Sequence, residues 1–210
     1  MTLSDPPPKA YDEPYFRRWY ARRGGIAPAA QLGRRVLLAV AAAEYVLERR
    51  VTSVLDVGCG EGRWRAPLRR LRPGLAYVGV DGSEWVVRRW GRRRGIVRGT
   101  FGELARLGLR RRFDLVVCSD VVHYVPGAEL HAGLAALEGL TRGLLWLDAF
   151  TAADDFDGDR VGWQPRSARA YRRALAKAGF TPCGLNGWVS AEGRGRLTAL
   201  ERLDLGGSLR

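Results

Sequence analysis

Residues 54–62 read VLDVGCGEG, an apolar run that passes directly into three glycines at alternate positions. Gly58, Gly60 and Gly62 allow a sharp turn and let a ligand approach the main chain closely. A helix expected near residues 62–71 would present unpaired N–H groups and the positive end of its dipole to that ligand. The stretch therefore predicts a strand, a ligand-binding turn and a helix. Its GxGxG spacing differs from the GxGxxG of dinucleotide-binding proteins.

Short apolar runs alternate with helical patterns through the middle of the chain. Apolar residues at helical spacing predict a helix over residues 30–49, ahead of the first strand. Beyond residue 71 the expected order is strand 76–80, helix 83–91, strand 96–97, helix 102–108, strand 113–118, helix 128–140 and strand 144–149. Such alternation is typical of a parallel sheet covered by helices on both faces. We therefore expect an α/β fold, a three-layer Rossmann-like sheet.

The last part of the chain breaks this alternation. Ser167 is placed to cap a helix that ends near Gly179. Residues 181–189 and 195–203 then predict two strands, and the short connection at 191–194 makes them antiparallel. We therefore expect a sheet of about seven strands that is mostly parallel, with an antiparallel C-terminal strand.

The first residues differ in composition from the rest of the chain. Three consecutive prolines within residues 1–10 predict a disordered start. Residues 11–23, YDEPYFRRWYARR, predict a short helix or a lid, and a surface helix that lays its aromatic residues on the domain is the alternative. We therefore expect a lead-in over residues 1–29 and one domain over residues 30–210.

The chain carries a formal net charge of +13, and nearly all of the excess is arginine. The arginines occur in pairs and triplets that are spread over the expected helix faces and loops. A basic surface favours nucleic acid or an anionic membrane, but charge governs association and not fold. Nucleic-acid binding is therefore an alternative that the sequence does not favour.

The sequence shows no targeting or membrane-spanning pattern. The first residues lack the positive and apolar regions of a secretory signal. The longest apolar run, residues 36–47, contains Glu44 and is too short to span a bilayer. Cys59, Cys118 and Cys183 are widely spaced and suggest neither a disulfide framework nor a metal-binding pair. We therefore expect a cytoplasmic protein with no membrane partner.

A second signal lies at the end of the second expected strand. Asp81 follows the apolar run there and lies 19 residues beyond Gly62. An acidic residue about twenty residues after a glycine turn can accept hydrogen bonds from the ribose hydroxyls of an adenosine cofactor. The alternative is an N-cap of the next helix, over Ser83 and Glu84.

These motifs resemble those of the class I S-adenosylmethionine-dependent methyltransferases over residues 51–150. The resemblance implies S-adenosyl-L-methionine as the cofactor and a seven-stranded sheet whose last strand is antiparallel. It also implies that Asp56, Gly58 and Gly60 line the methionine part of the cofactor and that Asp81 holds its ribose. The implied cofactor-binding residues are Asp56, Gly58, Cys59, Gly60, Gly62, Asp81, Gly82, Thr100, Phe101, Cys118 and Ser119.

Two further stretches take part in the resemblance. Residues 99–101, GTF, stand where the family flanks the adenine, and a threonine replaces the acidic residue that is common there. Residues 113–125, FDLVVCSDVVHYV, resemble the fourth motif, which brings Cys118, Ser119 and Asp120 to the open end of the sheet.

His123 and Asp120 are the candidate catalytic residues. His123 follows the fourth strand on the ligand side of such a sheet, and an imidazole titrates near neutral pH, so it can serve as a general base. The alternative is a loop histidine packed beside the cofactor. Asp120 is expected to touch the methionine amino group or to orient the acceptor, and its alternative is a helix cap. His131 is expected on a helix surface, and Asp148 ends the fifth strand at the same rim.

Residues 151–161, TAADDFDGDRV, predict an acidic loop that overhangs the acceptor site. A calcium loop needs glycine at position six and an acidic residue at position twelve. Counted from Asp155, those positions hold Arg160 and Arg166, so the pattern does not match. We therefore expect no bound metal, and the alternative implied by the resemblance is a magnesium ion that orients a catechol, as in some members of the family.

The resemblance implies transfer of a methyl group to an acceptor. The appended elements are short, which favours a small molecule methylated on oxygen, nitrogen or carbon, in a pocket lined by Tyr15, Trp19, His123 and Tyr124. A methyltransferase for RNA or another macromolecule is the first alternative, although residues 118–121 read CSDV and not the NPPY of base-amino methylases. The second alternative is a cofactor-binding module without catalysis, since one fold hosts many functions.

Overall fold

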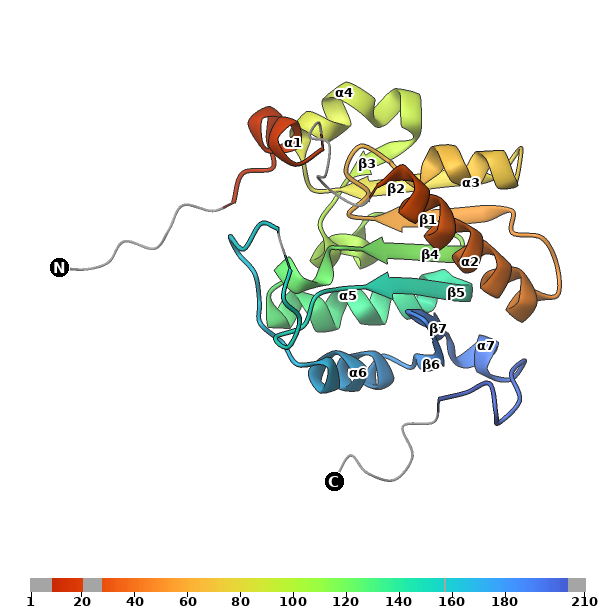
Figure 1. Cartoon of the computed structure of the whole chain (residues 1–210). Helices are drawn as coiled ribbons and strands as arrows, with labels where there is room; N and C mark the ends of the chain where they lie inside the picture. The colour runs from red at the N-terminus through yellow and green to blue at the C-terminus, as the bar shows by residue number, and fades with distance from the viewer. Residues whose placement is uncertain (1–8, 21–27, 157, 204–210) are drawn as a thin grey trace.

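A seven-stranded sheet forms the centre of the protein in the computed structural model, which describes residues 9–20, 28–156 and 158–203. The strands stand in the order β3-β2-β1-β4-β5-β7-β6 (Figure 1). They are β1 (Ser53–Val57), β2 (Ala76–Asp81), β3 (Ile96–Arg98), β4 (Phe113–Ser119), β5 (Thr141–Asp148), β6 (Thr181–Gly184) and β7 (Gly187–Val189). The first five are parallel, and β7 runs antiparallel to both of its neighbours. The expected fold class is confirmed.

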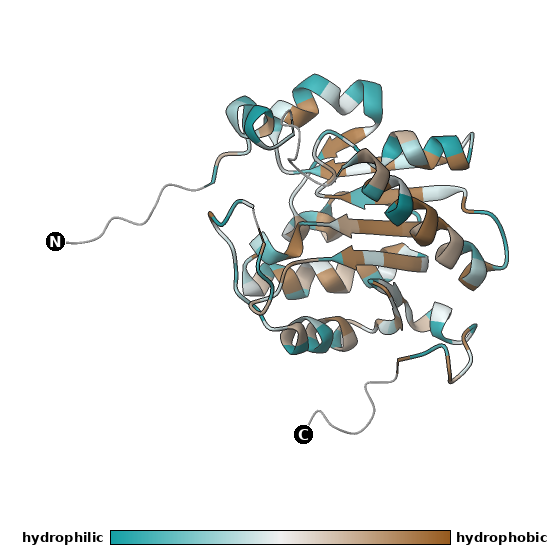
Figure 2. Ribbon diagram, in the orientation of Figure 1, coloured by the Kyte–Doolittle hydropathy of each residue, from teal (hydrophilic) through white to brown (hydrophobic). Residues whose placement is uncertain are grey.

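The central strands are apolar because both of their faces are covered. Every residue of β1 is buried, and so are the first six residues of β4. Figure 2 shows the central strands in the colour of hydrophobic residues, while the outer helices carry most of the hydrophilic ones. Parallel strands buried on both sides have this near-continuous apolar pattern.

Helices cover both faces of the sheet. On one face, α2 (Ala29–Leu47) and α3 (Arg65–Leu71) pack on the central strands through Val36, Val40 and Leu68. On the other face, the helices η1 (Phe101–Arg106), α5 (Gly127–Leu140) and α6 (Ala168–Lys177) share a core with β4 and β5. The remaining helices are α1 (Glu13–Tyr20), α4 (Glu84–Arg94), η2 (Val122–Tyr124) and α7 (Ala191–Arg194). No helix in the described part of the chain is both long and apolar enough to cross a membrane.

The C-terminal hairpin lies earlier in the chain than the sequence pattern predicts. Both of its strands fall within the predicted first strand, residues 181–189, and the turn between them is Leu185-Asn186. These two residues have positive φ angles of 45° and 66°, as a two-residue hairpin turn requires. The predicted turn at 191–194 is the helix α7, capped by Ser190, and the prediction of a strand at 195–203 is wrong.

The strand order reverses between β1 and β4, because the chain builds β2 and β3 on one side of β1 and then crosses to the other. In open parallel sheets, ligands bind in the crevice outside the carboxyl ends of the strands at such a switch point. The glycine turn follows β1, and Asp120 follows β4. The fold therefore places both motifs beside the same crevice.

Candidate active site

The glycine turn after β1 is crowded. Gly58, Gly60 and Gly62 have φ angles of +67°, +51° and +73°, a region that side chains disfavour. A Cβ on Gly58 would lie 2.2 Å from Val121 Cγ2, and one on Gly60 would lie 2.3 Å from the Tyr20 hydroxyl oxygen. Both the conformation and the close packing therefore require glycine at positions 58 and 60.

The N–H groups of this turn already have protein partners. Gly58 and Cys59 donate to the Val80 carbonyl at 2.8 and 3.1 Å, and Gly60 donates to Asp81 Oδ2 at 2.7 Å. The N–H groups of residues 58–60 are therefore not free for a ligand, and the expected free donors of the helix at 62–71 are a separate set. These bonds tie the turn to the end of β2, which places Asp81 directly beside the glycines.

Asp81 bridges two loops. Its other oxygen, Oδ1, accepts the Ser83 N–H at 2.9 Å. Burial raises the pKa of the Asp81 carboxyl group, and the hydrogen bonds from the Ser83 and Gly60 N–H groups oppose that increase. The N-cap of α4 is Ser83, whose hydroxyl accepts the Val86 N–H at 3.1 Å. Ser83, and not Asp81, is therefore the N-cap of α4, so the alternative role of Asp81 as the N-cap is wrong. The role of its carboxylate in holding ribose hydroxyls stays a prediction.

Further carboxyl groups gather at the ends of β1, β4 and β5. Asp56 is 2% exposed and accepts the Tyr77 hydroxyl at 2.6 Å, and burial raises its pKa to about 7. Asp120 adopts a left-handed conformation with φ of 60°, and burial together with the charge of Asp148 raises its pKa to about 6. In a chain with a net charge of +13, this edge of the sheet is acidic, and it suits a cationic ligand.

Asp148 organises this edge. Its Oδ1 accepts the Asp120 N–H at 3.0 Å, and its Oδ2 accepts both Arg35 Nη1 and Trp146 Nε1 at 3.2 Å. Arg35, on α2, was not predicted from the sequence as a site residue. Arg35 is far from the motifs in the sequence, so no local pattern indicates a role in the site. Its contact with Asp148 exists only because α2 packs on β5.

The helix α1 covers the glycine turn. Phe16 is 3% exposed and stacks on Trp85 of α4, with ring centroids 5.1 Å apart. Tyr20, at the end of α1, places its hydroxyl against Gly60. Trp19 is half-buried, with the Arg18 guanidinium 5.2 Å from its ring centroid, and its predicted place in an acceptor pocket stays a prediction. Within residues 9–20, the lead-in packs over the cofactor region, while residues 1–8 and 21–27 lie outside the described residues.

His123 is buried in an aromatic group. Its ring centroid lies 4.3 Å from that of Tyr124 and 5.6 Å from that of Phe150. Its Nδ1 accepts the Phe150 N–H at 3.4 Å, and burial lowers its pKa to about 4. The imidazole is therefore neutral at neutral pH, and its contacts hold the acidic loop against η2. A role as general base stays a prediction, and His131 is exposed on α5, as expected.

Several predicted cofactor contacts face the core. Cys118 is fully buried, and Phe101 is 5% exposed, in the core that α5 shares with the sheet. Cys59 packs with Phe16 and with α4. The side chains of Cys118 and Phe101 therefore do not reach the crevice, whereas Ser119, at the end of β4, is half-buried at its rim.

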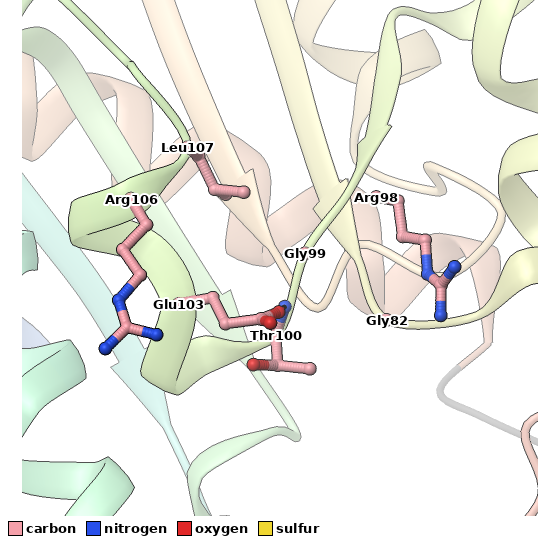
Figure 3. A pocket seen from close by; sticks show the side chains of 7 residues that line it. All are labelled: Gly82, Arg98, Gly99, Thr100, Glu103, Arg106 and Leu107. Atoms are coloured by element: carbon pink, nitrogen blue, oxygen red, sulfur yellow. Dashed lines mark hydrogen bonds between the residues drawn. The ribbon is translucent and has the colours of Figure 1, made fainter.

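A cavity of about 320 Å³ lies beside the ends of β2 and β3. Its lining consists of Gly82, Arg98, Gly99, Thr100, Glu103, Arg106 and Leu107 (Figure 3). Arg98 and Arg106 flank it from opposite sides, and Glu103 Oε2 accepts the Thr100 N–H at 2.9 Å. Gly82 and Thr100, predicted for cofactor binding, therefore share one open space.

The acidic loop has protein partners of its own. Asp154 Oδ2 accepts the N–H and hydroxyl of Thr151, and Asp159 Oδ2 forms an ion pair with Lys9 Nζ at 2.7 Å. Lys9 and Asp159 were not predicted as site residues. Within residues 9–20, 28–156 and 158–203, no group of three or more histidine, cysteine, aspartate or glutamate side chains is arranged to hold a metal ion.

Comparison with protein families agrees with this geometry. Residues 55–142 match the family model of a methyltransferase domain. The chain carries a class I S-adenosylmethionine-dependent methyltransferase domain. The match spans the glycine turn, Asp81 and the end of β4, and S-adenosyl-L-methionine is the methyl donor. A comparison with curated proteins found no significant relative.

Solved structures share the fold of this methyltransferase domain. A methyltransferase from Archaeoglobus fulgidus gives a TM-score of 0.60 at 18% identity, covering 79% of this chain and 72% of that one. A sugar N-methyltransferase from Streptoalloteichus gives 0.60 at 21%, covering 83% and 87%. Magnesium protoporphyrin IX methyltransferase from Synechocystis, solved with S-adenosylhomocysteine, gives 0.54 at 19%, covering 86% and 96%. These identities establish the fold alone.

The residues present suit this donor. Its sulfonium and ammonium groups are cations, and Asp120, which is mostly ionised at neutral pH, supplies a matching charge at the acidic edge, whereas Asp56 is partly protonated and Asp148 is paired with Arg35. Its ribose hydroxyls are hydrogen-bond donors, which the Asp81 carboxylate can accept. The space next to Gly60 holds the Tyr20 hydroxyl, so we expect α1 to shift when the donor binds.

Proposed function

We propose that this methyltransferase acts on a small-molecule acceptor, on an oxygen, nitrogen or carbon atom. The main support for this proposal is that α1 and the acidic loop cover the glycine turn. The helix α1 lies on that turn, and the acidic loop meets the same region through Asp159 and Lys9. A macromolecule would need a more open approach to the donor, whereas a small molecule can be enclosed.

The relatives described above support this proposal. By their names, one methylates a sugar nitrogen and another acts on magnesium protoporphyrin IX, and both are small molecules. A macromolecular acceptor would be favoured by arginines that converge on the crevice. Arg98 and Arg106 line the open cavity, but the arginine runs of α3 and α4 are largely exposed.

The donor supplies an electrophilic methyl group bound to a positively charged sulfur, and the protein positions a nucleophile against it. We assign Asp56, Gly58 and Gly60 to the methionine part and Asp81 to the ribose. Asp120 is assigned to the donor's ammonium group. The acceptor then approaches from the side of α1, Tyr124 and the acidic loop. We also propose residues 30–210 as the domain and the lead-in as its lid.

Two measurements test the proposal. Isothermal titration with S-adenosylmethionine and S-adenosylhomocysteine, with NAD as a control, is expected to give binding of the first two and none of NAD. A transfer assay with tritiated methyl donor then compares pools of amines, phenols, carboxylic acids and sugars with total RNA. Label that enters RNA and none of the small-molecule pools would overturn the small-molecule proposal in favour of the macromolecular one.

A further inference from the structure

The ammonium group of Lys9 lies in a ring of aromatic side chains. Its Nζ is 3.6 Å from the ring centroid of Tyr124, 5.0 Å from that of Tyr11 and 5.3 Å from that of Tyr15. Asp159 Oδ2 completes the ring at 2.7 Å, and the Lys9 side chain is only 11% exposed. We call Tyr11, Tyr15, Tyr124 and Asp159 the tyrosine cage. Aromatic faces around a cation are a recognition device for alkylammonium groups.

The tyrosine cage spans the glycine turn. On one side, the Tyr11 carbonyl accepts the Ser83 hydroxyl at 2.5 Å, just beyond the end of β2. On the other side, Tyr124 belongs to η2, which follows β4. Because β1 lies between β2 and β4 in the sheet, the cage bridges the end of β1, where the glycine turn begins. A methyl acceptor is expected to approach the donor from this side.

We propose that the tyrosine cage binds the amine group of the methyl acceptor and that Lys9 occupies the cage while the acceptor is absent. This inference rests on the proposed function and narrows its acceptor to an amine. Lys9 precedes α1 in a segment without helical hydrogen bonds, so its side chain can leave without unfolding a helix. Tyr11 is 38% exposed, which leaves the cage accessible on that side.

The cage also suits the chemistry of an amine. Only a neutral amine has the lone pair that attacks a methyl group, and burial at this position lowers the pKa of the Lys9 ammonium, against the opposing effect of Asp159. The bound ammonium first releases one proton to the Asp159 carboxylate, and from there to solvent. The neutral amine nitrogen then forms a bond to the methyl carbon, and the carbon–sulfur bond breaks with its electron pair left on sulfur. The methylated nitrogen releases a second proton by the same route.

The test measures binding of simple probes to the full chain in the presence of S-adenosylhomocysteine. NMR titrations compare 1-butylammonium with the neutral 1-butanol for the wild type, Lys9→Ala and the control Lys177→Ala. Lys177 is the other lysine of the sequence and is exposed on α6. If Lys9 fills about nine-tenths of the cages, its removal tightens 1-butylammonium binding about tenfold, and 1-butanol stays the much weaker ligand in every variant. Adding Tyr124→Leu to Lys9→Ala is expected to reverse this gain.

Three outcomes would overturn the inference. Equal affinity of Lys9→Ala and the wild type for 1-butylammonium would indicate that Lys9 only holds the lead-in against the domain through its ion pair with Asp159. Equal affinity of Lys9→Ala for 1-butanol and for 1-butylammonium would indicate an apolar space without recognition of a cation. Methylation of Lys9 itself, read by mass spectrometry after incubation with the donor, would indicate self-modification. Binding of S-adenosylhomocysteine, measured separately, distinguishes these results from a failure of the proposed function.

Discussion

Replacing Asp120 with asparagine should stabilise the ligand-free protein at neutral pH. Asp120 has a φ of 60°, and asparagine tolerates this left-handed conformation about as well as aspartate does. The substitution Asp120→Asn therefore changes the charge with little change in shape. It removes one of two carboxylates that lie together, since the Asp120 N–H is bonded to Asp148 Oδ1 at 3.0 Å.

The size of the effect follows from the pKa. Burial and the charge of Asp148 raise the pKa of Asp120 from 3.8 to about 6, and each unit corresponds to about 1.4 kcal/mol. Because the folded state holds its proton more tightly than the unfolded chain, this group costs stability progressively as the pH rises from about 4 to about 6. The cost is below about 1 kcal/mol at pH 4 and about 2–3 kcal/mol at pH 8.

Thermal unfolding of the ligand-free protein at pH 4 and pH 8 measures this cost. For a domain of this size we expect Asp120→Asn to raise the Tm by about 4–10 °C at pH 8 and by far less at pH 4. The control is Asp155→Asn, because the side chain of Asp155 is fully exposed. Equal Tm values for the variant and the wild type at pH 8 would refute the claim that the acidic edge is electrostatically strained.

Three further substitutions test the assigned roles. Gly60→Val should abolish donor binding in calorimetry, because a side chain is strained at a φ of +51° and would block the donor's approach to the main chain, whereas Gly139→Ala, with nothing within 4 Å, should bind normally. Asp81→Ala should weaken binding by about 1–3 kcal/mol through lost hydrogen bonds to a charged acceptor, and an unchanged Kd would leave Asp81 only its role in joining two loops. His123→Ala should lower the turnover number if His123 is a base; unaltered turnover with an identified acceptor would remove that role.

The acidic edge also predicts how donor binding depends on pH. If Asp120 binds the donor's ammonium group, protonation of Asp120 below its pKa of about 6 weakens binding in the wild type. Asp120→Asn should bind more weakly at pH 8 and lose this dependence. Titration at pH 5 and pH 8 checks both statements, and a pH-dependent Kd that persists in the variant would assign the proton to another group.

Local patterns predicted the first half of the fold well. The passage from an apolar run into glycines predicted β1 and its turn, because strand burial and left-handed glycines depend on a few neighbouring residues. The C-terminal hairpin was misplaced because the choice between residues 181–189 and 195–203 depends on which segment pairs with β5. That pairing is a contact between distant residues and leaves no local pattern.

The same difference between local patterns and long-range contacts applies to the donor side and the proposed acceptor side of the site. The sequence by itself determined the proposed donor-binding motif, since Asp56, Gly60 and Asp81 lie within one strand–turn–helix–strand unit whose geometry repeats wherever the pattern occurs. The tertiary structure alone decided the side that we propose for the acceptor. Lys9, Tyr124 and Asp159 come from three distant segments, and they meet because α1 and the acidic loop fold back over the carboxyl edge of the sheet. Long-range packing of this kind has no period or spacing in the chain, so it becomes visible only when the whole domain is assembled.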